Sequence, residues 1–522
     1  MSDDVLRALY PHLIDETGQG GHRLGGKLRE LVKREPELAD ELEAAKPRRR
    51  KKKSAAAGPA AEADLGLTDL GNACRLVRQH GRDLRYCAVW KKWLVWDGRR
   101  WARDDTGEVF RRAKQTVATI YAEAEGAVDA DERKRIAAHA IRSESERAIK
   151  AMLTLAQSEP EVAVAPGAFD QDPWLLNVLN GTLNLGTGEL RPHRREDLIT
   201  KLAPVEYDPD ASFDLWDKFL DRMLPDVATR EFCQRAAGYT LTGLTSEEVL
   251  FFLHGPAAAG KSSFIGALQA VLGDYAVTAD FETFLHRERV TGGPRNDIAR
   301  LAGARLVVSV EVTDGARLAE GLVKQLTGGD VVTARFLHAE AFEFRPAFKL
   351  WLSANNRPTV RADDEAMWRR ILEVPFDQVL PKEERDPRVK EQLRDPAVAG
   401  PAVLAWAVRG CLDWQQRGLA VPERVEQTTL AYRQAMDPLE DFIADCCIVS
   451  PLARVRNSDL WGAYEKWARS SGERFPVGRK RFAQELSRRG FAQLRSSSGR
   501  FWEGLGLVDH RFNDDTLTLR DT

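Results

Sequence analysis

The stretch that decides the fold of this 522-residue chain reads Val249-Leu-Phe-Phe-Leu-His-Gly255-Pro-Ala-Ala-Ala-Gly260-Lys261-Ser262-Ser263. Its apolar start, Val249 to Leu253, predicts a buried strand, and Phe264, Ile265 and Leu268 follow the loop at helical spacing. Between strand and helix stands the pattern G-x-x-x-x-G-K-S, which binds phosphate in this context. The sequence therefore predicts an α/β domain that contains a phosphate-binding loop.

Each residue of the predicted loop has an expected role. Gly255 and Gly260 let the backbone approach a phosphate, while amide N–H groups and the following helix N-terminus face the anion. Lys261 reaches the outer phosphates, and the Ser262 hydroxyl can bind Mg²⁺. The alternative is a glycine turn that carries an exposed lysine. The complete set of predicted ligand-binding residues is Gly255, Pro256, Ala257, Ala258, Ala259, Gly260, Lys261, Ser262 and Ser263.

Two later strands end in polar residues that nucleotide hydrolysis requires. The run Arg305-Leu-Val-Val-Ser-Val-Glu311 ends in a carboxylate that could order magnesium and water. The run Phe348-Lys-Leu-Trp-Leu-Ser-Ala354 leads to Asn355, whose amide can reach the γ-phosphate or hold the attacking water. The alternatives are a buried strand that happens to end in Glu311 and an asparagine-rich turn before Pro358.

Two adjacent arginines follow the second of these strands. Asp363-Asp-Glu-Ala-Met-Trp-Arg369-Arg370 predicts a short helix. An arginine that reaches a phosphate from a neighbouring subunit accelerates hydrolysis by about 10³–10⁵ in the best-studied cases. The alternative role for Arg369 and Arg370 is a surface salt bridge with the acidic residues that precede them.

A projecting hairpin is expected between the two strands. Residues 331–344 alternate about a centre near His338, directly after Lys324-Gln-Leu-Thr-Gly-Gly-Asp330. Arg335 and His338 therefore lie on an element that could reach a partner.

Composition sets the broad class of the protein. The chain is 43% hydrophobic and 30% charged with a net charge of −2, so bulk charge does not indicate a nucleic-acid-binding protein. The six cysteines lack C-x-x-C spacing, which argues against a zinc site and suits a reducing cytoplasm. No apolar run approaches the length of a membrane span, so we expect a cytoplasmic protein without membrane contact.

Pattern and composition divide the chain into several parts. The basic run Pro47-Arg-Arg-Arg-Lys-Lys-Lys53 marks a linker, which could be a solvated tether or a phosphate-binding one. The predicted parts are a small helical module (1–45), a basic, Ala/Pro-rich linker (46–64), a mixed α+β domain (65–245), an ATPase core (246–380), a helical lid or connector (381–436), a winged-helix domain (437–510) and a tail (511–522).

The C-terminal domain is locally basic. Residues 469–500 contain nine Arg or Lys against two Glu. A helix with an apolar stripe and a basic face is followed by a strand–turn–strand, which is the winged-helix pattern. Such a basic patch indicates phosphate binding, whereas a winged helix used for protein contact is the alternative. The predicted DNA-binding residues of this domain are Arg479, Lys480, Arg481, Arg488 and Arg489.

Four blocks in this order resemble the superfamily 3 helicases of the phage and plasmid primase–helicase family, which is related to satellite-phage and poxviral primase–helicases. The blocks are Gly255–Ser262, Arg305–Glu311, Lys324–Arg335 with its Thr-Gly-Gly-Asp, and Leu352–Pro358 followed by Trp368-Arg-Arg-Ile371. Upstream, Asp172-Pro-Trp-Leu-Leu-Asn-Val-Leu-Asn-Gly-Thr-Leu and Gly188-Glu-Leu-Arg-Pro-His193 resemble the domain that precedes the core in this family. The resemblance covers residues 65 to about 510.

The resemblance implies an AAA+-like subunit of a ring, usually hexameric, that hydrolyses ATP with Mg²⁺ and translocates 3′ to 5′ on single-stranded DNA. It assigns Glu311 as the catalytic or metal-ordering carboxylate, Asn355 as the sensor, and Arg369 or Arg370 as the finger acting across the subunit boundary. Ser262 and Glu311 would hold the metal. Lys324 would line the interface or channel, and Arg335 and His338 would touch DNA.

Two expectations concern what the chain does with DNA. Many relatives carry an N-terminal primase domain, which needs clustered carboxylates on a domain longer than the 64 residues that precede the matching region. We therefore expect this chain to bind single-stranded and forked DNA and to unwind duplex DNA without priming, with a separate primase or polymerase as partner. The alternatives are an AAA+ DNA-loading or packaging ATPase and an ATP-gated origin-binding protein without unwinding.

Overall fold

The protein was analysed as a computed structural model, in which the described residues are 65–286, 295–310, 316–337, 340–361, 363–471, 476–496 and 499–508. All of these residues belong to one compact unit. The predicted helical module (1–45), the linker (46–64) and the tail (511–522) lie outside the described residues, as do Glu311 and His338.

The described chain begins with helices and a small antiparallel sheet. The helices are α4 (Asp69–His80), α5 (Glu108–Gly126), α6 (Ala130–Ser143) and α7 (Glu146–Ala156), and the strands are β1 (Leu84–Cys87), β2 (Lys92–Trp96) and β3 (Trp101–Arg103). Strands β2 and β3 pair with Trp96 opposite Trp101 and form a hairpin around Asp97-Gly98. Val109, Val117 and Met152 from the helices pack with Leu76 and Leu84 to form a core of this part.

A second antiparallel sheet leads to the central domain. Strands β4 (Leu175–Val178), β5 (Gly181–Asn184) and β6 (Glu189–Arg191) pair in that order. Helices α8 (Asp214–Met223) and α9 (Val227–Leu241) follow. Leu176 and Leu183 of this sheet pack in the same core as Phe251 of the central domain, so the second sheet and the central domain share one hydrophobic core.

The centre of the molecule is a five-stranded parallel sheet. Its strands are β7 (Leu250–His254), β8 (Ala276–Thr278), β9 (Leu306–Val310), β12 (Lys349–Ala354) and β13 (Ile371–Pro375). Their spatial order is β13-β7-β12-β9-β8, and every neighbouring pair is parallel. The protein is thus a mixed α/β structure with a parallel central sheet, as expected for its fold class.

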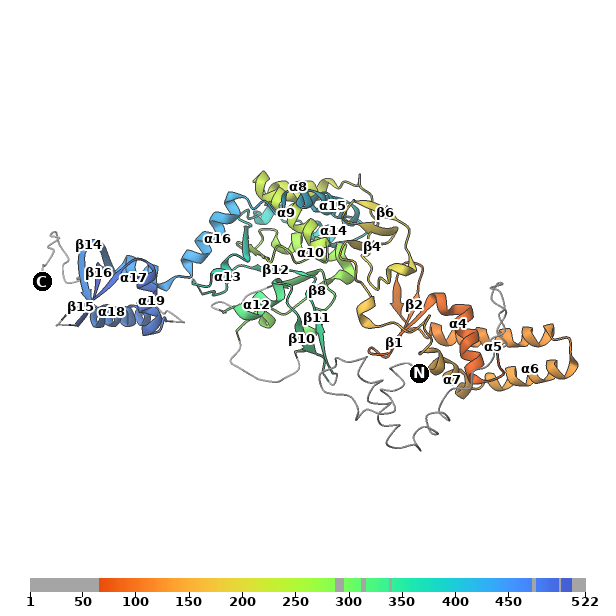
Figure 1. The fold of residues 1–522 in the computed structure, drawn as a ribbon. Helices are drawn as coiled ribbons and strands as arrows, with labels where there is room; N and C mark the ends of the chain where they lie inside the picture. The colour runs from red at the N-terminus through yellow and green to blue at the C-terminus, as the bar shows by residue number, and fades with distance from the viewer. Residues whose placement is uncertain are drawn as a thin grey trace, which may run out of the picture. The chain divides into compact units, whose positions relative to one another are not determined.

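Both faces of this sheet are covered. Phe251 and Leu253 point into one core with α8, α9, α10 (Lys261–Leu272) and α15 (Gly400–Arg417), whereas Leu250 and Phe252 point into another. The second core contains residues of α12 (Glu320–Thr327) and of the hairpin β10 (Val332–Arg335) and β11 (Ala341–Phe344). Figure 1 shows α8, α9 and α15 on one side of the sheet and α12 with the hairpin on the other. Burial on both faces explains why these strands read as continuous apolar runs.

A buried arginine connects the second antiparallel sheet to the central one. Arg305, directly before β9, donates from its guanidinium to the carbonyl oxygens of Leu241 and Leu175 at 2.7 Å each. Its charge lies over the Tyr275 ring, 4.8 Å from the centroid. Burial lowers the pKa of Arg305, because no water remains to solvate the cation. The sequence run around Arg305 predicted the strand but not this connection.

The remaining elements complete the described chain. They are α11 (Asn296–Ala299), α13 (Glu365–Trp368), α14 (Pro387–Arg394), α16 (Glu423–Ala435), α17 (Pro438–Cys446), β14 (Cys447–Arg456), α18 (Asn457–Ser470), α19 (Arg479–Arg488), β15 (Ala492–Ser496) and β16 (Gly499–Leu507). The last three strands form an antiparallel sheet in the order β14-β16-β15. Phe482 and Leu486, the predicted apolar stripe of α19, are buried in the core of this C-terminal module. No helix among the described residues is long and apolar enough to cross a membrane.

We predict that Gly410→Ala in α15 lowers the thermal midpoint of unfolding. A Cβ at this position would lie 2.0 Å from the carbonyl oxygen of Gln234 in α9, so the two helices would have to separate. Overpacking of this kind costs about 1–3 kcal/mol. Gly462→Ala in α18 is the matched control, because nothing lies within 4 Å of its Cβ position. The control should gain about 0.4–1 kcal/mol from reduced chain entropy. Equal stabilisation by both substitutions would disprove the close contact.

Candidate nucleotide-binding site

The parallel sheet brings the polar strand ends together. Strand β7 lies between β12 and β13. The strands β8, β9 and β12 that follow it in the chain all lie on one side of β7, and β13 then pairs on its other side. Ligands of open α/β sheets bind at the carboxyl edge at such a reversal. His254 of β7 is level with Ala354 of β12, and Ser353 is level with Val310 of β9. The loop after His254 and the Asn355 side chain therefore start at the same edge, where β9 also ends.

The loop between β7 and α10 has the backbone of a tight anion-binding turn. Three of its residues have positive φ angles, namely Gly255 (150°), Ala258 (63°) and Gly260 (86°). Both glycines are also required by close contacts, since a Cβ on Gly255 would lie 2.0 Å from the Phe376 carbonyl oxygen and one on Gly260 would lie 2.7 Å from Cγ of Met223. Helix α10 begins at Lys261, so its free N–H groups adjoin the loop.

Lys261 is a buried cation with neutral partners. It is 7% exposed, and its Nζ donates to the carbonyl oxygens of Gly255 (2.6 Å) and Pro256 (2.7 Å) and to Oδ1 of Asn355 (2.9 Å). Among the described residues, no carboxylate forms an ion pair with it, and burial lowers the pKa of its ammonium group. An anion placed at this ammonium would supply the missing negative charge. The donor set therefore fits a phosphate group.

The predicted metal ligands are only partly described. Ser262 lies in the first turn of α10, and its carbonyl oxygen accepts a bond from Arg394 at 2.9 Å. Glu311 lies outside the described residues. Elsewhere in the described chain, no group of three or more His, Cys, Asp or Glu side chains could hold a metal ion. Mg²⁺ usually needs only one or two protein ligands when a nucleotide supplies the others. The hydroxyl of Ser262, which follows Lys261 directly in the chain, could serve as one such ligand.

A buried acidic network next to the loop was not predicted. Glu373 of β13 is fully buried, and its Oε1 accepts bonds from Arg357 at 2.9 and 3.0 Å and lies 2.8 Å from Nδ1 of His254. The Arg357 guanidinium also lies over the Tyr432 ring, 5.3 Å from the centroid. The network connects the start of the loop to the segment after Asn355. A glutamate inside the apolar run Ile371-Leu-Glu-Val-Pro375 was the sequence signal for it.

The two candidate finger arginines differ in exposure. The Arg370 side chain is 9% exposed and donates to Glu248 Oε2 at 2.6 Å and to the Ala366 carbonyl oxygen at 2.7 Å. The Arg369 side chain is 68% exposed and lies 3.8 Å from Glu248. Helix α13 ends at Trp368, so both arginines follow the predicted helix rather than lying in it.

The acidic residues before these arginines have other partners than the sequence suggested. Asp364 pairs with Lys324 and Arg361, whereas Glu365 pairs with Arg433. Asp363 forms an ion pair with Arg481. The predicted alternative of local salt bridges between Arg369 or Arg370 and these three carboxylates is therefore wrong.

The predicted DNA-contacting residues in and near the hairpin differ in whether their charge is already paired. Lys324 Nζ donates to Asp364 at 2.8 Å, so its charge is already paired. Arg335 is exposed on β10, and His338 lies outside the described residues. Two exposed apolar side chains that the sequence analysis did not select, Phe336 and Leu337, follow Arg335 and are 41% and 59% exposed.

Several of the basic C-terminal residues are likewise paired with carboxylates instead of being free to bind DNA. Arg481 pairs with Asp363, Arg489 pairs with Asp437, and Arg488 lies 3.1 Å from Glu485. Arg479 and Lys480 are exposed at the start of α19 and form no ion pair within the described part of the chain. Carboxylates thus occupy three of the five predicted DNA-binding side chains in this module.

Comparison with known proteins supports the resemblance drawn from the motifs. Residues 73–225 match the family described as D5 N terminal like, residues 434–493 match Poxvirus D5 protein-like, and residues 253–370 match a family of unknown function. The chain is 28% identical over 331 residues to putative helicase L207/L206 of Acanthamoeba polyphaga mimivirus. The aligned region covers 58% of this chain and 34% of the relative. It is 27% identical over 280 residues to putative helicase 022R of Frog virus 3, covering 50% and 28%.

The chain spans about a third or less of the length of these two curated relatives. A shorter match, 28% identical over 151 residues, is putative helicase V13 of Sputnik virophage, covering 28% of this chain and 19% of the relative. Among solved structures, the NrS-1 C-terminal region aligns with 85% of this chain and 99% of its own at a TM-score of 0.46 and 9% identity.

We predict that Arg370→Ala and Arg369→Ala differ in stability. Removal of the largely buried Arg370 side chain takes away its hydrogen bonds to Glu248 and to the Ala366 carbonyl oxygen, and should lower the free energy of unfolding by about 1–3 kcal/mol. Removal of the exposed Arg369 should change it by less than about 0.5 kcal/mol. Thermal unfolding of the two variants beside the unmodified protein measures the difference. Equal destabilisation would show that the difference in exposure has no energetic consequence.

Proposed function

We propose that this chain, which carries domains of the poxvirus D5 type, is an ATP-dependent DNA helicase of superfamily 3 that works as a ring of identical subunits. The observation that carries the proposal is the buried Lys261 ammonium, whose partners in the described part of the chain are neutral oxygens at the carboxyl edge of a parallel sheet. A phosphate is the ligand that completes such a site. The putative-helicase names of the relatives support the choice of activity.

Each residue of the site has a role in this proposal. Lys261 would exchange its carbonyl partners for the outer phosphate oxygens of ATP. Mg²⁺, when bound, supplies charge that offsets the phosphates, and Ser262 and Glu311 would hold it. Asn355, already in contact with Lys261, would orient the attacking water. Phosphoryl transfer depends mainly on such positioning and charge stabilisation.

The network behind the site would position two of these groups. Glu373 binds Arg357 and His254 at once, and these residues lie beside Asn355 and Gly255 in the chain. A buried carboxylate held by two partners resists displacement, because breaking either contact leaves a charge uncompensated. We assign Glu373 as a positioning residue that fixes the segment after Asn355 relative to the phosphate loop.

Of the two arginines, Arg369 is the better candidate for a finger that acts on the neighbouring subunit. A finger has to extend from its own subunit, and the Arg369 side chain is 68% exposed and lies 3.8 Å from Glu248. Arg370 is held in place within its own chain. We therefore assign Arg369 to the shared active site and Arg370 to the packing of α13 against Glu248.

DNA contact would come from two places. The exposed hairpin side chains Arg335, Phe336 and Leu337 can meet a single strand through charge and apolar contact. The C-terminal module, which we interpret as a winged helix, presents Arg479 and Lys480 on α19 and Arg495 and Arg500 on its strands. A ring of six subunits and 3′ to 5′ movement follow from the family resemblance alone.

Two other functions use the same nucleotide site. A DNA-loading or packaging ATPase would hydrolyse ATP without separating strands, and an origin-binding protein would use ATP only to control assembly. The projecting hairpin and the exposed Arg369 favour the helicase, because a protein that only binds DNA requires neither. A forked-duplex unwinding assay separates these alternatives.

We predict that Lys261→Ala and Arg369→Ala each abolish ATP hydrolysis stimulated by single-stranded DNA, and that mixing the two variants restores part of it. In a mixed ring, some interfaces join an intact phosphate loop to an intact arginine from the next subunit. Arg300→Ala, which changes another exposed arginine of the same domain, is the control and should keep its activity. ATP turnover and fork unwinding are measured across mixing ratios, with subunit exchange shown by labelled co-purification.

Two outcomes would contradict the proposal. Retention of most ATPase activity by Lys261→Ala would remove the phosphate-loop assignment. With subunit exchange demonstrated, a complete lack of restored hydrolysis would show that Arg369 does not act between subunits. Hydrolysis by the unmodified protein without any unwinding of a fork would favour the loading or packaging ATPase.

A further inference from the structure

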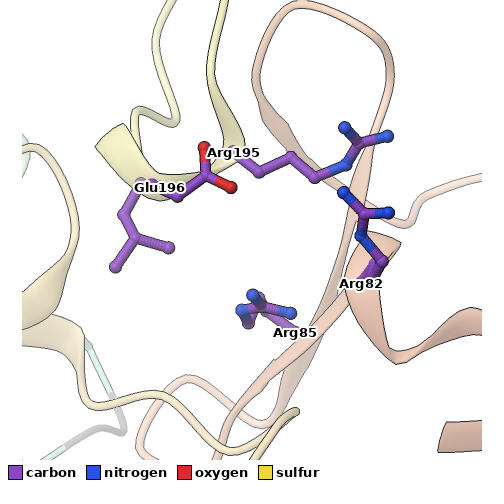
Figure 2. A pocket seen from close by; sticks show the side chains of 5 residues that line it. Arg82, Arg85, Arg195 and Glu196 are labelled. Carbon is purple, nitrogen blue, oxygen red and sulfur yellow. The ribbon is translucent and has the colours of Figure 1, made fainter. Parts of the chain in front are cut away.

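A cavity outside the nucleotide site is lined mainly by arginine. It has a volume of about 240 Å³ and lies between the segment joining α4 to β1 and the segment after β6. We call it the arginine pocket, and its lining residues are Arg82, Arg85, Arg195, Glu196 and Leu198. Figure 2 shows the three guanidinium groups around the opening, with the Glu196 carboxylate beside Arg195. None of these residues belongs to the ATPase core.

Tryptophan rings hold two of the guanidinium groups. The Arg85 guanidinium lies 4.4 Å from the centroid of the Trp101 ring, and that of Arg195 lies 5.4 Å from the Trp96 ring. A planar cation over an indole is fixed in orientation, and its edge N–H groups stay available for a ligand. Trp101 is fully buried and Trp96 is 9% exposed, so these rings support the arginines and offer no open face to a base.

The positive charge of the pocket is only partly balanced. Arg82 and Arg85 form no ion pair within the described chain, and Arg85 uses its Nη1 on the carbonyl oxygens of Gly81 and Leu84 at 2.7 Å each. Arg195 donates its Nε to Asp83 at 2.5 Å, a carboxylate that also lies 3.7 Å from Arg112. With three arginines and one glutamate in the lining, the formal charge of the pocket is +2.

Hydrogen bonds fix the part of the pocket wall that runs from Arg195 to Leu198. Trp101 donates from its indole Nε1 to the Arg195 carbonyl oxygen at 2.9 Å and from its backbone N to the Ile199 carbonyl oxygen at 2.8 Å. Leu198 has a φ of 48°, a conformation that a branched residue adopts only when its surroundings impose it. The arginines are therefore arranged before any ligand arrives.

We propose that the arginine pocket binds a backbone phosphate of single-stranded DNA. A phosphate oxygen accepts several guanidinium N–H bonds at once, and contacts to phosphate position a strand without reading its sequence. The inference rests on the proposed DNA helicase function. It assigns a second DNA contact to the domain that precedes the ATPase core, apart from the hairpin and the C-terminal module. A free nucleoside triphosphate presents the same chemical group, and the experiment distinguishes the two sources.

The test measures binding of a fluorescein-labelled oligothymidylate to the full chain by anisotropy over a range of salt concentrations. Arg82→Gln combined with Arg195→Gln should weaken binding by about tenfold and make the plot of log affinity against log salt shallower by about 0.7 for one lost phosphate. Arg135→Gln combined with Arg147→Gln is the control, because it removes the same charge from exposed positions of the same domain. The control should change neither the affinity nor the salt slope.

If the double variant unfolds, Arg82→Glu alone is measured instead. This variant should fold, because Arg82 is exposed and its removal disturbs no described ion pair. It should weaken binding at least as strongly as the double variant. Affinities equal to that of the unmodified protein in both pocket variants, or an equal loss in the control, would overturn the inference. Displacement of DNA by ATP from Lys261→Ala protein, but not from Lys261→Ala with Arg82→Glu, would assign the pocket to free nucleotide instead.

The same assay separates this inference from the proposed function. If the unmodified protein unwinds forks and the pocket variants bind single strands normally, only the pocket inference is wrong. If the unmodified protein binds no single-stranded DNA, the helicase proposal and the pocket inference both fail.

Discussion

Burial of the central sheet on both faces is the constraint on which the rest of the structure depends. Side chains in the middle of β7 and β12 have no access to water, so nearly all of them are apolar. Polar chemistry can begin only where these strands end, and parallel strands all end at one edge. Lys261 and Asn355 meet there through a direct hydrogen bond although they are far apart in the chain. The geometry of the candidate site is thus a consequence of how the sheet is covered.

Local sequence was sufficient for the elements that form the site. A strand, the glycine loop and a helix could be placed from residues 249–268, because apolar periodicity and the G-x-x-x-x-G-K-S pattern act within a few residues. The strand before Asn355 followed from its continuous apolar run for the same reason. The pairing order of the strands required the structure, since it depends on contacts between distant segments.

Contacts between residues far apart in the chain could not be predicted from the sequence. Arg370 looked equivalent to Arg369, yet Glu248 binds it from the segment before β7, more than a hundred residues earlier. Lys324 and Arg481 looked like free cations, but Asp364 and Asp363 hold them. A charge in a sequence says nothing about its partner, so the structure is needed to show which cations keep N–H groups available for a ligand. The arginine pocket was missed for the same reason, because its residues come from two separate segments.

We infer that the Lys261 ammonium binds an outer phosphate of ATP. The most direct measurement is a structure of the full chain with Mg²⁺ and a non-hydrolysable ATP analogue, in which the partners of Lys261 Nζ are read off. We expect Nζ to leave the Gly255 and Pro256 carbonyl oxygens and to bind an outer phosphate, with Asn355 beside it. A bound analogue with Lys261 still on those two carbonyl oxygens, and its phosphates elsewhere, would contradict it.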